Sequence, residues 1–310
     1  MNASISNAPA RASFVPLDTP WVRRVRRGER PSAAELQEHL LAVHRHHAGF
    51  TESCAGRCRD AQGRNSYQWL AEAVDPHCHR RVLDLACGSG PLTAWCRQRF
   101  GAAVALTGVD MSPEELALAR LRIPDPDVVL HCGLAQQLDF LDDASVDAVL
   151  CHWALTLMDP VEPVLAEVRR VLGEGGIFAA IVDGERTSAP GYDELHHLIY
   201  GWVQREYPGY GTIDLGDVRV RTTAELTALV VETFPTAAVR VEPGVVYLEA
   251  PSEVLAREAV GFFYAAFVLS AEAHRQMLAE VENWFIRRGL VEGRGRFAMP
   301  INRLVVAPRP

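Results

Sequence analysis

The stretch Val82-Leu-Asp-Leu-Ala-Cys-Gly-Ser-Gly90 decides the fold of this chain, because it joins a short apolar run to a glycine-rich turn. Residues 91–100 then have the character of a helix, and Gly101 stands where a C-terminal helix cap belongs. A strand, a glycine turn and a helix in this order allow backbone N–H groups to approach a ligand closely. We therefore expect a ligand site where this first strand ends.

The same rhythm of strand and helix continues on the C-terminal side. Further strands are predicted at 102–109, 128–130, 146–151 and 176–182. Capping motifs predict helices that begin after Ser32, Ser112 and Thr222. The alternation indicates a parallel sheet that is covered by helices on both faces. In such an open sheet, ligands bind beyond the carboxyl ends of the strands.

Two acidic residues restrict the kind of ligand. A dinucleotide-binding turn would have a third glycine where Thr93 stands, and Asp84 would repel an anionic pyrophosphate. Asp110 ends the second strand, where a carboxylate can accept hydrogen bonds from both hydroxyls of a ribose. The expected ligand is a nucleoside with a cationic or zwitterionic tail and without phosphates.

The composition excludes several classes of protein. All 31 basic residues are arginine, so a Schiff-base enzyme, a Walker A loop and a protein kinase are excluded, because each needs a lysine. The net charge of −8 argues against a general nucleic-acid binder. We find no signal peptide and no apolar run that could span a membrane, and the seven cysteines indicate reduced thiols. These features predict a cytoplasmic protein. They do not decide between a monomer and a homodimer.

Five motifs in a fixed order resemble those of the class I S-adenosylmethionine-dependent methyltransferases. They lie at 84–90, 109–112, 132–138, 145–155 and 164–176, and the resemblance covers roughly residues 65–183. The small-molecule branch that includes the ubiquinone and menaquinone methyltransferases is the most similar. The resemblance implies an α/β fold, a doubly wound, Rossmann-like, seven-stranded and mostly parallel sheet whose seventh strand is antiparallel.

The resemblance also implies S-adenosylmethionine as the cofactor. Asp84, Ala86 and Gly88 are expected along its methionine portion, Asp110 on the ribose and Met111 on the adenine. Tyr67 is either a residue over the methionine carboxylate or a packed aromatic residue. The remaining expected contacts are backbone contacts to the adenine edge and to the methionine ammonium, from Leu134, Ala135 and Cys151.

The acceptor side is predicted less closely. His152 follows the fourth strand and is either a catalytic base or a residue of the pocket wall. Trp153 is expected beside it, and His196, His197 and Tyr200 are expected on a substrate lid formed by residues 184–236. The alternative is that the helix within 184–236 only packs against the core. The sequence at 151–154 lacks the pattern of enzymes that methylate nucleic-acid amino groups.

The chain thus divides into five predicted parts: an extended basic arm (1–31), an N-terminal helical cap (32–78), the cofactor-binding core (79–183), the inserted lid (184–236) and the C-terminal part of the sheet with helices (237–310). Histidines and acids near 44–47, 77–79 and 193–197 lack a zinc spacing, so no metal is expected. We expect methylation of oxygen or carbon in a small molecule, in specialised or quinone-like metabolism. A cofactor-retaining cyclase and a non-catalytic cofactor-binding protein are the alternatives.

Overall fold

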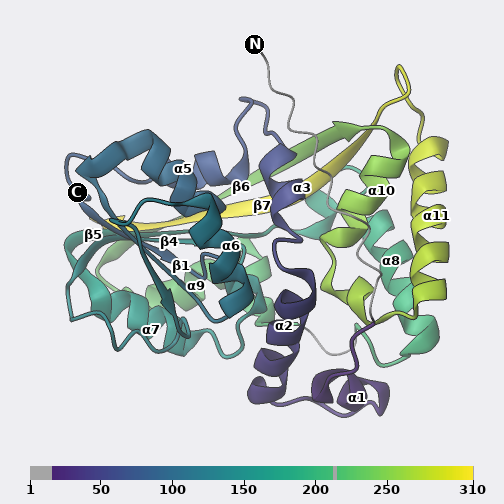
Figure 1. The fold of residues 1–310 in the computed structure, drawn as a ribbon, viewed down its shortest axis with the longest axis horizontal. Helices are drawn as coiled ribbons and strands as arrows, with labels where there is room; N and C mark the ends of the chain where they lie inside the picture. The colour runs from purple at the N-terminus through teal and green to yellow at the C-terminus, as the bar shows by residue number, and fades with distance from the viewer. Residues whose placement is uncertain (1–15, 212–214, 310) are drawn as a thin grey trace.

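The computed structural model describes residues 16–211 and 215–309, which form a seven-stranded sheet in the order β3-β2-β1-β4-β5-β7-β6 (Figure 1). The strands β1 to β5 are parallel, whereas β7 is antiparallel to both β5 and β6. This topology confirms the predicted fold class. The strands are β1 (Arg81–Leu85), β2 (Ala105–Asp110), β3 (Val129–Cys132), β4 (Val146–His152), β5 (Leu172–Asp183), β6 (Ala237–Ala250) and β7 (Gly295–Pro308).

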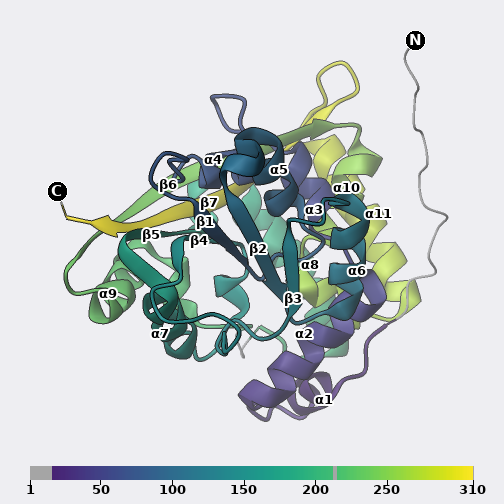
Figure 2. The ribbon, with the colours of Figure 1, turned by 60° about the vertical axis from the view of Figure 1, so that its left-hand side comes forward.

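Helices cover both faces of the sheet (Figure 2). On one face, α7 (Glu162–Val171) and α9 (Thr223–Thr233) bury Leu165 and Leu229 against the strands. On the other face, α4 (Ser66–Ala71) and α5 (Pro91–Phe100) bury Leu70 and Leu92. The strands are therefore apolar on both sides, as parallel strands in such a fold are.

The predicted helix starts are confirmed by their caps. The Ser32 hydroxyl accepts from the backbone N–H of Glu35 at the start of α2 (Ala33–His47), and the Glu35 carboxylate accepts from the Ser32 N–H in return. Ser112 caps α6 (Pro113–Arg122), and Thr222 caps α9. Each cap satisfies N–H groups that the first turn of a helix leaves without a partner.

The basic segment near the N-terminus differs from its prediction. Part of the expected extended arm lies outside the described residues, but Pro20–Arg26 forms the helix α1. Thr19 caps this helix, and Trp21, Val22 and Val25 are buried. The arginine run alternates with these apolar residues, so it forms the outer face of a packed helix.

A helical layer stands at the other end of the molecule from α7 and α9 (Figure 1). It contains α8 (Tyr192–Glu206), α10 (Ser252–Gly261) and α11 (Ala271–Arg287). The helices α10 and α11 are inserted between β6 and β7, which still pair along their whole length. The short helices are α3 (Glu52–Arg57) and the 3-10 turns η1 (Gly101–Ala103), η2 (Leu155–Leu157), η3 (Arg186–Ser188), η4 (Val218–Arg221) and η5 (Tyr264–Val268). Among the described residues, we find no helix with the length and apolar character that a membrane span requires.

Candidate active site

A cavity of about 440 Å³ opens beyond the carboxyl ends of β1, β2 and β4. The glycine turn after β1 forms one wall, and α2 and the turn between α10 and η5 cover the cavity. Most of the predicted site residues line it, namely Tyr67, Asp84, Ala86, Gly88, Asp110, Met111, Leu134, Ala135, His152 and Trp153. The sheet topology brings them together, because parallel strands end at a common edge.

Asp84 is a buried carboxylate with one free oxygen. Its Oδ2 accepts from the Thr93 hydroxyl, whereas Oδ1 has no hydrogen-bond partner among the described residues. Burial raises the pKa of Asp84 to about 7, although the hydrogen bonds from Thr93 act in the opposite direction. An unpaired buried carboxylate is costly unless a donor or cation meets it. This site therefore fits the cationic methionine end of S-adenosylmethionine.

Asp110 is held in place by two backbone donors. The Gly88 N–H donates to Oδ2 at 2.8 Å, and the Ser112 N–H donates to Oδ1 at 2.9 Å. Burial raises the pKa of this carboxyl despite these hydrogen bonds. Each oxygen has a lone pair left, which fits the predicted contact with the two ribose hydroxyls.

The turn between these two carboxylates has a left-handed backbone. Ala86 has φ of +56° and Gly88 has φ of +54°. Glycine adopts this conformation freely, whereas an alanine does so at a cost.

Cys151 is the one predicted cofactor residue that is absent from the described cavity wall. Its side chain is fully buried, and burial raises the pKa of the thiol to about 12, which keeps it neutral. Only its backbone carbonyl was expected to contact the cofactor, so that contact stays a prediction.

His152 is fixed by two neighbouring residues of α4. Its Nε2 lies 2.8 Å from the Ser66 Oγ, and its ring stacks on Tyr67 with the centroids 3.9 Å apart. Burial lowers the pKa of His152 to about 3. The imidazole therefore faces the cavity as a neutral group.

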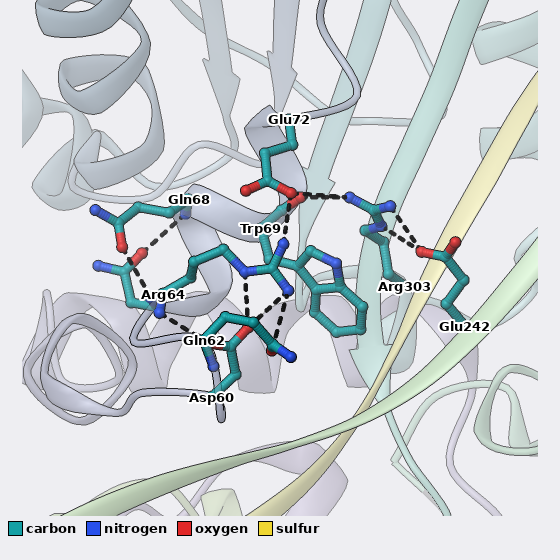
Figure 3. A network of polar contacts seen from close by, with 9 residues as sticks. Asp60, Gln62, Arg64, Gln68, Trp69, Glu72, Glu242 and Arg303 are labelled. Atoms are coloured by element: carbon teal, nitrogen blue, oxygen red, sulfur yellow. Dashed lines mark hydrogen bonds and ion pairs between the residues drawn. The ribbon is translucent and has the colours of Figure 1, made fainter.

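A network of charged residues fixes α4 against the sheet (Figure 3). Arg303 of β7 donates to the Trp69 carbonyl and pairs with Glu242 of β6, each at 2.7 Å. Arg64 pairs with Asp60 at 2.8 Å and with Glu72 at 2.6 Å. These contacts hold the helix that presents the partners of His152.

Trp153 lies beside His152 at the end of β4 and has φ of +61°, which is rare for a bulky side chain. Its indole Nε1 donates to the Asp183 Oδ1 at 2.8 Å, and its ring packs edge-on against Phe262 at 4.8 Å. Burial raises the pKa of Asp183 against this hydrogen bond and the field of Arg221. The sequence interpretation missed Asp183 and Phe262, although Asp183 directly follows a predicted strand and could have been found.

The helix α2 covers the cavity through a link that the sequence interpretation also missed. The His44 Nδ1 lies 2.8 Å from the Glu115 Oε1, and the His44 Nε2 lies 3.1 Å from the Tyr264 hydroxyl. The Gly49 N–H donates to the same Glu115 oxygen at 2.9 Å. A single histidine thus joins α2 to α6 and η5 over the site.

The predicted lid residues lie elsewhere. His196, His197 and Tyr200 are on α8, and no described residue of the segment 184–236 lines the cavity. His196 stacks on Tyr200, and α8 buries Leu195 and other apolar residues against the neighbouring helices. The prediction that these three side chains bind substrate therefore finds no support here, because their helix packs as part of the core. The structure places the cover in α2 and the α10–η5 turn.

Three arginines of the segment 184–236, namely Arg205, Arg219 and Arg221, also lie outside the described cavity wall. Arg219 pairs with Asp217 and Glu162, Arg205 stacks over Trp202, and Arg221 donates to a backbone carbonyl. Within residues 16–211 and 215–309, no three His, Cys, Asp or Glu side chains form a metal-binding group.

Comparison with known proteins identifies the domain that holds this cavity. Residues 83–180 match the family described as a methyltransferase domain. Together with the strand order, this match shows that the chain contains a class I S-adenosylmethionine-dependent methyltransferase domain.

Individual relatives agree with that assignment. An uncharacterized methyltransferase of Mycobacterium tuberculosis is 41% identical over 118 residues, which cover 37% of this chain and 45% of the relative. A demethylmenaquinone methyltransferase of Chlorobaculum parvum is 35% identical over 120 residues, or 39% of this chain and 47% of the relative. The matches thus span about half of the length of these relatives.

One solved structure has a similar fold over nearly the whole chain, although its sequence differs. The crystal structure of the [4+2]-cyclase SpnF covers 90% of this chain and 97% of its own, with a TM-score of 0.51 and 17% identity. The fold is therefore shared with a protein that is described as a cyclase.

Proposed function

We propose that this protein transfers the methyl group of S-adenosylmethionine to an oxygen or carbon atom of a small molecule, in specialised or quinone-like metabolism. The cavity carries this proposal, because its two buried carboxylates stand at the carboxyl ends of β1 and β2. Asp84 has an oxygen free for a cation, and Asp110 has lone pairs free for hydroxyl groups. The similarity to a demethylmenaquinone methyltransferase supports a small acceptor.

The cofactor supplies an activated methyl group on a sulfonium, so the protein has to align the acceptor and exclude water. The covering helix α2 and the α10–η5 turn close the cavity over the ends of the strands. His152 faces this space as a neutral imidazole, and we propose that it orients the acceptor by a hydrogen bond. A pKa of about 3 makes it a weak general base, because a base works best with a pKa near the working pH.

Binding and transfer are tested separately. Calorimetry with S-adenosylhomocysteine should show one site, and methyl-labelled S-adenosylmethionine should label a product from reduced naphthoquinones or from a low-molecular-weight cell extract. Absence of binding would refute the cofactor assignment. Binding without any labelled product would favour a cofactor-retaining cyclase or a non-catalytic cofactor-binding protein.

A further inference from the structure

We propose that the acceptor carries an ammonium group, which binds at Asp183 beside Trp153 and Phe262, and that a different atom of the acceptor receives the methyl group. This inference rests on the proposed methyl transfer and names the chemical class of the acceptor. It favours specialised over quinone-like metabolism, because a reduced naphthoquinone carries no ammonium group. Three features of the cavity support it: the sign of its charge, the aromatic wall around Asp183, and the chemistry of methyl transfer.

Carboxylates outnumber basic side chains in the cavity wall, although Glu52 pairs with Arg122 and Glu115 contacts His44. Six carboxylate side chains line it, and no arginine does among the described residues. An anionic acceptor would have to leave water and enter a space whose described wall holds carboxylates and no arginine. A neutral or cationic acceptor avoids that penalty.

The cofactor accounts for only part of this negative charge. Its sulfonium and ammonium groups outweigh its carboxylate by one positive charge, and Asp84 and Asp110 stand at the strand ends assigned to it. Asp183 ends β5, on the far side of His152 from the glycine turn, because β4 lies between β1 and β5. A negative group therefore remains on the acceptor side.

The surroundings of Asp183 are those of an ammonium site. Its Oδ1 is fixed by the Trp153 indole at 2.8 Å, and the carboxylate remains partly accessible from the cavity. The indole meets the rings of Phe262 and His152 edge-on at 4.8 and 5.1 Å. A carboxylate beside aromatic rings attracts an organic cation both by charge and by the cation–π interaction.

The backbone of Trp153 gives independent support. Its φ of +61° is unfavourable for a bulky residue, so the surrounding contacts must hold the indole at the cavity wall. Such local strain is concentrated at ligand sites. The indole orients Asp183 and supplies an aromatic surface at the same time.

A bound ammonium cannot itself accept the methyl group, because its nitrogen has no free electron pair. An oxygen or carbon of the acceptor forms the new bond to the methyl carbon, while the carbon–sulfur bond breaks and its electrons stay on sulfur. The proton that this acceptor atom carried is released to solvent. The ammonium group therefore serves to position the acceptor, which agrees with oxygen or carbon methylation.

The test uses three probes of matched size on the full chain saturated with S-adenosylhomocysteine at pH 8. They are 2-phenylethylamine, which is protonated, 2-phenylethanol, which is neutral, and 3-phenylpropionate, which is anionic. Calorimetry should show that the amine binds roughly tenfold more tightly than the alcohol, and that the anion binds most weakly. Equal binding of amine and alcohol, or tighter binding of the anion, would overturn the proposal.

Asp183→Asn removes the charge and keeps an oxygen that can accept from the indole. This variant should lose the preference for the amine and keep its affinity for S-adenosylhomocysteine, whereas Asp142→Asn, an exposed control outside the described cavity wall, should keep both. A preference that persists in Asp183→Asn would also overturn the proposal. If the wild-type protein does not bind S-adenosylhomocysteine, the proposed function is wrong. If it binds S-adenosylhomocysteine but does not prefer the amine, only the ammonium site is wrong.

Discussion

The Nε2 of His152 lies 2.8 Å from the hydroxyl oxygen of Ser66, so the end of β4 is tied to the first residue of α4. The next residue of α4, Tyr67, stacks on the same imidazole. Two consecutive residues of a short helix thus fix the ring that stands between the predicted cofactor and acceptor sites. The orientation of His152 depends on this helix as much as on the sheet.

This arrangement predicts how His152 contributes to the rate. With a pKa of about 3, the imidazole stays neutral throughout the physiological range, so kcat should show no step from His152 between pH 5 and 8. His152→Ala should lower kcat by roughly tenfold to hundredfold, with little change in the affinity for S-adenosylhomocysteine. Ser66→Ala should cause a smaller loss of the same kind. A step near pH 6.5 that disappears in His152→Ala would show that the imidazole ionises and acts as a base.

Asp110→Ala should weaken the binding of S-adenosylhomocysteine by roughly a hundredfold to ten-thousandfold, because the two charged hydrogen bonds to the ribose contribute about 1.5–3 kcal/mol each. The variant also releases the Gly88 N–H, which Asp110 now holds. Calorimetry measures the change, and Asp127→Ala, at an exposed position, serves as the control. Unchanged affinity in Asp110→Ala would place the ribose elsewhere.

Asp84 predicts a dependence of stability on pH in the ligand-free protein. Its pKa rises from 3.8 to about 7 on folding, so the folded state binds the proton more tightly than the unfolded chain. The contribution of this group to the free energy of unfolding is therefore greatest below pH 4 and declines as the pH rises to about 7. Asp84→Asn, which can still accept from Thr93, should remove that decline in denaturant titrations.

Ionisation of Asp84 should have the opposite effect on cofactor affinity, which we expect to increase as the pH rises. A cationic ligand favours the ionised form, so the affinity for S-adenosylmethionine should rise between pH 5 and 7, by at most about tenfold per unit. Calorimetry in buffers of different ionisation enthalpy should detect the release of a proton near pH 6. An affinity that does not change with pH would show that the cation lies away from Asp84.

The sequence was sufficient to predict the sheet and to bring the expected cofactor residues to one cavity. The strand that contains Asp84 and the one that ends at Asp110 have local patterns, and parallel strands necessarily bring their ends together. Helix caps such as Ser32 and Ser112 are also local, and the structure confirms both. Features determined by contacts between neighbours in sequence were therefore predictable.

The cover of the cavity could not be predicted in this way. The aromatic and histidine residues of α8 suggested a lid, but an amphipathic helix does not reveal which surface it packs against. The link from His44 to Glu115 joins residues 71 positions apart, and Phe262 reaches the cavity from an insertion between β6 and β7. Contacts of that range depend on the tertiary structure, and no local pattern encodes them.

His44→Ala should loosen α2 over the cavity. The substitution removes one of the two partners of a buried Glu115 oxygen and the contact with Tyr264, which we expect to lower the free energy of unfolding by about 1–3 kcal/mol. Hydrogen exchange across residues 33–47 should accelerate more than exchange in β1. The exposed His46 on the same helix provides the matched control, and His46→Ala should change neither quantity. Equal effects of the two variants would show that the link to Glu115 does not hold the helix.

Arg303 and Arg240 both pair with Glu242, but only Arg303 is enclosed by protein. Its side chain is 12% exposed and also reaches the Trp69 carbonyl, whereas the side chain of Arg240 is 65% exposed. Exposed ion pairs contribute at most about 1 kcal/mol, and breaking a buried one costs roughly 3–5 kcal/mol.

Arg303→Ala should therefore lower the free energy of unfolding by several-fold more than Arg240→Ala in denaturant titrations. Arg303 anchors the helix that carries Ser66 and Tyr67. Loss of Arg303 should therefore also lower kcat, as Ser66→Ala does. Arg240→Ala should leave kcat unchanged. A loss of stability in Arg303→Ala without any change in kcat would show that α4 keeps His152 oriented without its anchor to β7.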